Sequence, residues 1–162
     1  MRSASSFTLQ VSALEVADLY AFQFDVTFDP TLFAASGAAE GAFLASGGTT
    51  FFDGGVIDNA TGVISFVFTT LIGAVPGVSG SGVLASFDFD AEGLANSLGA
   101  FQPTNVIALD SSFNLIDVAI EAQNVSRPES AALSLSLAAL AMLGASVRRR
   151  RAAGTVFTAA TS

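Results

Sequence analysis

Carboxylates are almost the only side chains in this 162-residue chain that could perform chemistry. The sequence has 14 aspartate and glutamate residues and no histidine, cysteine, lysine or tryptophan. The absence of histidine and cysteine excludes Ser-His-Asp and Cys-His nucleophile pairs and the usual nitrogen and sulfur ligands of zinc. Two chemistries remain open to carboxylates alone, namely acid-base cleavage of a glycosidic bond and coordination of calcium.

The densest group of acids alternates with apolar residues and consists of Asp88, Asp90 and Glu92. This period of two predicts a strand that presents the three acids on a solvated outer face. A glycosidase needs two carboxyl groups that converge on a cleft and have pKa values split by their surroundings. The pattern therefore favours a non-enzymatic protein, and a glycoside hydrolase or accessory polysaccharide-processing protein is the less favoured alternative.

A second group of acids, Asp53 and Asp58, flanks a loop that contains Gly54, Gly55 and Asn59. Oxygen ligands of this kind suit calcium. The spacing matches neither an EF-hand nor a glycine-aspartate repeat, and Asp-Gly and Asp-Asn pairs are ordinary turn formers. We therefore interpret these residues as turns and expect no cofactor, with calcium as the one candidate ion.

Three phenylalanines set among glycines are candidates for partner contact, namely Phe43, Phe51 and Phe52. They could form an apolar patch for a partner or a glycan, or they could cap the end of the core, which is the commoner role. The glycine-rich segment 71–82 has no lysine and lacks the spacing of a phosphate-binding loop. We interpret it as a long flexible connection.

Strands must position these side chains. From residue 20 to residue 28 apolar and polar residues alternate without interruption, and we expect one face to be buried: Tyr20, Phe22, Phe24, Val26 and Phe28. Gln23, Asp25 and Thr27 should face outward, because a one-residue slip would bury Asp25 unpaired. The same period recurs at 7–11, at 64–68, at 85–89 and, less regularly, at 113–120, and it places Ile64, Phe66 and Phe68 on one face. Short alternating strands separated by glycine-rich turns predict an all-β fold of two antiparallel sheets packed face to face.

Four segments of the sequence resemble cohesin domains: 19–32, 40–44, 57–65 and 80–85. The most specific piece is the strand that ends in Phe28-Asp29-Pro30 with Leu32 following. The similarity spans about residues 5–125 and implies a nine-stranded jelly-roll sandwich related to carbohydrate-binding modules. Cohesins of cellulosomes bind dockerins. Cohesins usually have another strand before the one at Phe7 to Val11, so the resemblance also implies that this strand lies unpaired at a sheet edge.

The C-terminal part of the chain has three pieces: a Pro-Glu-Ser motif, an apolar run at 131–147 and four arginines. The run of 17 residues is about 25 Å long as a helix, at the short end of what spans a bilayer, and adjacent arginines resist translocation. This order resembles the PEP-CTERM sorting signal, which an exosortase recognises and removes in Gram-negative bacteria. The residues that match the motif are Pro128, Glu129, Ser130, Arg148, Arg149, Arg150 and Arg151.

The resulting domain plan is a sandwich at 5–125, a linker at 126–130, a transmembrane helix at 131–147 and a basic cytoplasmic tail at 148–162. Residues 1–126 contain thirteen acids against Arg2 alone, a net charge near -12, which repels nucleic acid and anionic lipid. Segment 1–6 has no apolar leader, so we expect a start assigned too late or a gene fragment.

We expect an exported envelope or matrix module, held in the inner membrane before processing, that binds polysaccharide. The alternative is a protein-protein scaffold module that engages a dockerin-like partner through one sheet face.

Overall fold

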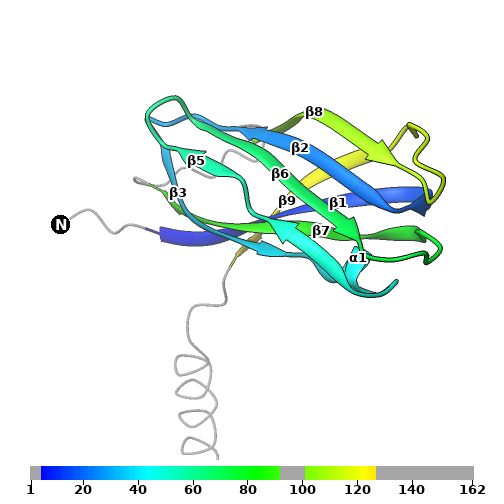
Figure 1. Ribbon diagram of the computed structural model, residues 1–162. Helices are drawn as coiled ribbons and strands as arrows, with labels where there is room; N and C mark the ends of the chain where they lie inside the picture. Colours follow the sequence, from blue (N-terminus) through cyan, green and yellow to red (C-terminus); the bar gives the residue numbers. More distant parts are fainter. Residues whose placement is uncertain (1–4, 92–100, 127–162) are drawn as a thin grey trace, which may run out of the picture. The chain divides into compact units, whose positions relative to one another are not determined.

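The computed structural model describes residues 5–91 and 101–126 (Figure 1). These residues form two antiparallel sheets that pack face to face, which confirms the predicted all-β sandwich. Sheet A has the strand order β3 (Phe33–Glu40), β7 (Val78–Ala91), β1 (Ser5–Leu19) and β9 (Ala119–Ser126). Sheet B has the order β4 (Thr50–Asp53), β6 (Val63–Leu71), β2 (Ala21–Thr27) and β8 (Gln102–Leu109), and β5 (Val56–Asp58) also pairs with β6. A single turn of helix, α1 (Ala42–Ala45), lies between β3 and β4.

The core between the sheets is rich in phenylalanine, as the alternation in β2 predicts. Tyr20, Phe22, Phe24, Val26 and Phe28 are all buried, and Phe24 and Val26 are 0% exposed. The Phe24 ring stacks on Phe22 at a centroid distance of 5.7 Å and meets Phe87 of sheet A edge to face at 6.3 Å. The predicted inward face of β2 is therefore confirmed.

The first strand does not lie at a sheet edge, so that expectation was wrong. β1 pairs with β7 on one side and with β9 on the other, and the β9 register runs from Phe7 opposite Ser126 to Leu14 opposite Ala119. The C-terminal strand of the sandwich thus covers the free edge of β1. β9 begins six residues later than the predicted strand at 113–120, because Asp110 accepts hydrogen bonds from the N–H groups of Ser112 and Asn114 and closes a turn there.

The glycine-rich segment 71–82 is not one long flexible connection, because β7 already begins at Val78. Two of its glycines, Gly77 and Gly82, mark close packing instead. A Cβ atom at Gly77 would lie 2.5 Å from the backbone of Asp18, and one at Gly82 would lie 2.6 Å from the Phe43 ring. Only glycine fits at such approaches.

Phe66 and Phe68 do not point into the core beside Ile64, so their predicted common inner face was wrong. Phe66 is 64% exposed, whereas Val67, Thr69 and Leu71 are buried. The register of β6 against β2 shifts by one residue between the pairs Val26–Ile64 and Phe24–Val67. This β-bulge reverses which side chains face the core.

No helix in the described part of the chain has the length and apolar character needed to cross a membrane. The predicted transmembrane helix at 131–147 lies outside the described residues, as do the sorting motif and the four arginines.

Candidate docking face

The outer face of sheet B carries several large apolar side chains although it points away from the core. Phe51 of β4 is 55% exposed and Ile107 of β8 is 45% exposed. The Phe51 ring lies 6.4 Å from the ring of Phe68 on the adjacent strand β6. Because exposed apolar side chains that gather on one face commonly mark contact sites, this face is the strongest candidate for function.

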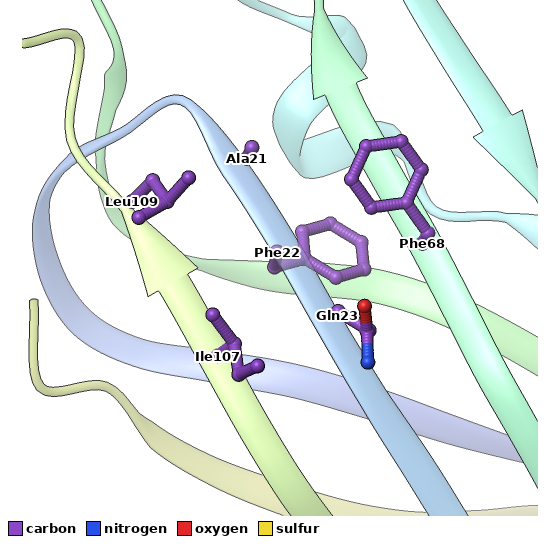
Figure 2. Close-up of a pocket in the computed structure, with 6 residues that line it drawn as sticks. All are labelled: Ala21, Phe22, Gln23, Phe68, Ile107 and Leu109. Carbon is purple, nitrogen blue, oxygen red and sulfur yellow. The ribbon is translucent and has the colours of Figure 1, made fainter. Parts of the chain in front are cut away.

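A shallow hollow lies in this face above β2 (Figure 2). Ala21 and Phe22 form its floor. The floor is low at Ala21 because alanine is the smallest side chain on the outer side of this strand. Phe68 stands on the β6 side, and Ile107 and Leu109 stand on the β8 side. Gln23 places an amide beside these apolar walls, so the hollow can receive one apolar side chain and one hydrogen-bonding group.

Asp25 of β2 lies between two β-bulges, one on each neighbouring strand. On the β6 side the N–H of Phe66 donates to Asp25 Oδ1 at 2.8 Å. On the β8 side Asn105 Nδ2 donates to Asp25 Oδ2 at 2.6 Å. Phe66 and Asn105 have φ angles of 60° and 51°, a left-handed conformation that is uncommon for residues other than glycine. Asp25 faces outward, as predicted, and both of its carboxylate oxygens are engaged.

The outer face of sheet A differs in chemistry. Along β1 and β7 it presents mainly small and polar side chains, among them Thr8, Gln10, Ser86 and Asp88, and its exposed large apolar residues are Leu14 of β1 and Val125 of β9. The Thr8 hydroxyl donates to Asp88 Oδ1 at 2.9 Å. Asp88 and Asp90 are exposed on this face, as their alternation predicts, and Glu92 lies outside the described residues.

The three phenylalanines singled out in the sequence lie in different surroundings. Phe51 points to the outer face of sheet B, whereas the adjacent Phe52 is half-buried and packs against the core. Phe43 of α1 is also half-buried and lies over Gly82 of β7. Phe43 and Phe52 therefore cap the core, and Phe51 alone of the three belongs to the apolar outer face.

The candidate calcium ligands form turns and an interstrand contact. Asp53 Oδ1 accepts from the N–H of Gly55, and Asp58 Oδ1 accepts from the N–H groups of Ala60 and Thr61. Hydrogen bonds from the Thr61 side chain and from these N–H groups lower the pKa of Asp58. The Asn59 amide bonds to both the N–H and the C=O of Ala35 in β3. No cluster of three acidic side chains that could hold a metal ion occurs within 5–91 and 101–126.

One end of the sandwich is fastened by Asp18. The Ser111 hydroxyl donates to Asp18 Oδ2 at 2.7 Å, and the N–H of Gly77 donates to Oδ1 at 2.8 Å. The hydrogen bond from the Ser111 hydroxyl, followed by those from the N–H groups of Gly77 and Ser111, holds the pKa of Asp18 below its usual value. Tyr20 adds a hydrogen bond to the Gly73 carbonyl at 2.6 Å. These contacts fix the loops that follow β6 and β8, next to the hollow.

The fold is a two-sheet antiparallel β-sandwich with an exposed apolar patch on one sheet. The family model of the cohesin domain matches residues 3–126. The chain belongs to the cohesin family.

Solved cohesin structures share the fold at low sequence identity. A non-cellulosomal cohesin from the archaeon Archaeoglobus fulgidus has 14% identity and a TM-score of 0.51, over 79% of this chain and 86% of that one. The sixth cohesin of Acetivibrio cellulolyticus scaffoldin B, solved in complex with the Cel5 dockerin, has 16% identity and a TM-score of 0.55, over 78% of this chain and 91% of that one. The third cohesin of ScaC from the same organism, in complex with the ScaB dockerin, has 16% identity and a TM-score of 0.52, over 72% and 83%. No curated protein matches the sequence.

The alternation in β2 placed Gln23 on the outer face correctly, but sequence reasoning missed the residues that form the walls of the hollow. The alternation at 64–68 predicts the wrong side for Phe68, and no pattern predicts the strand that carries Ile107 and Leu109. One signal was present in the sequence, since Ala21 is small and is flanked along the strand by large aromatic residues.

Proposed function

We propose that this chain is a protein-protein docking module that receives a dockerin-like partner on the outer face of sheet B. The observation that carries the proposal is the hollow above Ala21, with Phe68, Ile107 and Leu109 around it. Membership of the cohesin family supports a scaffold role, and two similar structures were solved with dockerins bound. The proposal assigns no catalytic reaction to the chain.

Charge narrows the chemistry of the partner. The described residues include twelve acids and no lysine or arginine. Asp25 and Asp53 lie on sheet B itself, beside the apolar residues. A fitting partner element therefore has an apolar stripe that fills the hollow and basic residues at its margins, because opposite charges accelerate association and orient the partner.

Polysaccharide was the partner expected first from the sequence, and the family and its similar structures favour the dockerin-like alternative instead. The outer face of sheet A offers small polar groups, and the rings on sheet B stand at the rim of a hollow the size of one side chain. A hollow of this size suits a single protruding side chain better than the flat face of a sugar ring.

The test measures binding of the full chain to the Cel5 and ScaB dockerins of Acetivibrio cellulolyticus and to a panel of neutral polysaccharides. Ile107→Asp puts a carboxylate into the wall of the hollow, and Gln10→Asp puts the same group on the outer face of sheet A as a matched control. We expect dockerin binding that weakens about 30-fold or more in the first variant, as for a central contact residue, and stays within about twofold in the second.

Association should also slow steeply as salt rises, because attraction between the acidic module and a basic partner is screened beyond about 8 to 10 Å. Salt-insensitive retention on polysaccharide together with no dockerin binding would replace the proposal with carbohydrate binding. Release of sugar from soluble oligosaccharide would favour the hydrolase alternative.

We further propose that the module is exported and anchored in the inner membrane before an exosortase processes it. The support is the order of the Pro-Glu-Ser motif, the apolar run at 131–147 and the arginines at 148–151. Fractionation of cells that contain an exosortase tests this proposal, with the chain expressed behind a working signal peptide.

A further inference from the structure

We propose that Asp25 is a positioning residue for the docking face, because its carboxylate holds the two bulges that turn the walls of the hollow outward. This inference rests on the proposed docking function for its biological meaning and on the strand registers for its geometry. Asp25 itself need not touch a partner.

The registers show what the bulges do. Before the bulge, Val26 pairs with Ile64 of β6 and with Pro103 of β8. After it, Gln23 pairs with Phe68 on one side and with Ile107 on the other. Each neighbouring strand has therefore gained one residue relative to β2, at the same level of the sheet.

One residue is enough to exchange the two faces of a strand. Without the bulge in β6, Phe68 would point into the core and Val67 would point to solvent. Without the bulge in β8, Ile107 would point inward and Ala108 outward. In the structure Val67 and Ala108 are 0% and 2% exposed, and Phe68 and Ile107 line the hollow. Both walls of the hollow therefore depend on bulges at the level of Asp25.

Asp25 is bonded to both bulges at once. The N–H of Phe66 and the side-chain amide of Asn105 donate to different oxygens of the one carboxylate, at 2.8 and 2.6 Å. Hydrogen bonds to a charged acceptor are stronger than neutral ones. They offset the unfavourable left-handed conformations of Phe66 and Asn105. A single side chain thus determines which alternate side chains of β6 and β8, the strands on either side of β2, face outward.

The test uses the absence of cysteine from the chain. Phe68→Cys and Val67→Cys are made separately in the full chain, and the rates at which a thiol reagent labels them are compared. In the parent background the first should react much faster than the second. Adding Asp25→Ala removes both hydrogen bonds, and the one from the Phe66 N–H is the one that holds β6, the strand that carries both cysteines. The rate ratio should therefore fall about tenfold, the effect expected from losing that one hydrogen bond to a charged group. Adding Asp88→Ala, which removes an outward carboxylate from sheet A, should leave the ratio unchanged.

A neutral variant separates positioning from loss of charge. In Asp25→Asn the amide oxygen can still accept from the Phe66 N–H, and the amide N–H can donate to Asn105 when the Asn105 amide turns over. Asp25→Asn should therefore keep most of the labelling ratio, whereas Asp25→Ala, which removes both acceptors, should lower it. An unchanged ratio in Asp25→Ala, or a fall in Asp25→Asn as large as in Asp25→Ala, overturns the proposal.

Binding of the Cel5 dockerin, measured on Asp25→Ala and Asp88→Ala without the cysteines, connects the inference to function. We expect weaker binding only in the first variant. If the labelling ratio responds while the parent chain binds no dockerin, the positioning role stands and the docking function fails. If dockerin binds and Asp25→Ala changes neither binding nor labelling, the docking function stands and the positioning role fails.

Discussion

Replacing Phe24 by alanine should lower the free energy of unfolding by about 3 to 5 kcal/mol, the usual cost of truncating a fully buried phenylalanine. The Phe24 side chain is 0% exposed and contacts the rings of Phe22 and Phe87, so its removal leaves a cavity between the two sheets. A domain of ordinary stability has about 5 to 15 kcal/mol in total. The variant should therefore unfold at much lower urea, by about 2 M if the denaturant slope is near 2 kcal/mol per M.

The matched control is Phe66→Ala on the adjacent strand. Phe66 is 64% exposed, so its truncation should change stability by less than about 0.5 kcal/mol. Urea unfolding followed by far-ultraviolet circular dichroism measures both variants under the same conditions. Equal losses in the two variants would mean that Phe66 is buried and that the bulge in β6 is placed wrongly. A loss below about 1 kcal/mol for Phe24→Ala would contradict the position of this side chain in the core.

Three further predictions concern single groups. Thr69→Val should stabilise the fold by about 1 kcal/mol in urea unfolding, because the buried Thr69 hydroxyl has no hydrogen-bond partner within the described residues; a loss of stability would show that the hydroxyl is bonded. Because the pKa of Asp18 is lowered in the folded state, its stabilising contribution is complete above the unfolded value of 3.8 and is lost as pH falls through the folded pKa. Asp18→Asn should therefore reduce the drop in melting temperature between pH 6 and pH 3. An unaltered acid response would contradict this role. Neutral residues in place of the arginines at 148–151 should mis-sort the exported chain in a host with an exosortase, and unchanged fractionation would count against the sorting proposal.

The strand at β2 could be predicted from the sequence because only one phase of its alternation is apolar. Along Tyr20 to Phe28 the opposite phase contains Gln23, Asp25 and Thr27, so one register buries far more apolar surface than the other. In the β6 segment, by contrast, the alternation does not show which side chains face the core. Both of its phases contain large apolar residues, Phe66 and Phe68 in one and Val67 and Leu71 in the other.

The side chains of β6 that face the core are decided by a long-range contact, which no local sequence pattern shows. The N–H of Phe66 bonds to Asp25, which is 41 residues away, and Asn105 reaches the same carboxylate across 80 residues. For the same reason the apolar outer face could not be located from the sequence. Phe43 and Phe52 attracted attention because glycines surround them, yet those glycines allow close packing on the core.

An apolar outer face on such an acidic domain also limits what can cover it. Exposed phenylalanines on a sheet invite self-association, which proteins oppose with charge. In this chain Asp25 and Asp53 lie on the same face as Phe51 and Phe68. Two copies that met through this face would bring carboxylates of like charge together with no described lysine or arginine to neutralise them. The apolar contact that the face offers is therefore less favourable for a second copy than for a partner with basic residues around an apolar stripe, so the acidic charge both opposes self-association and favours the proposed partner.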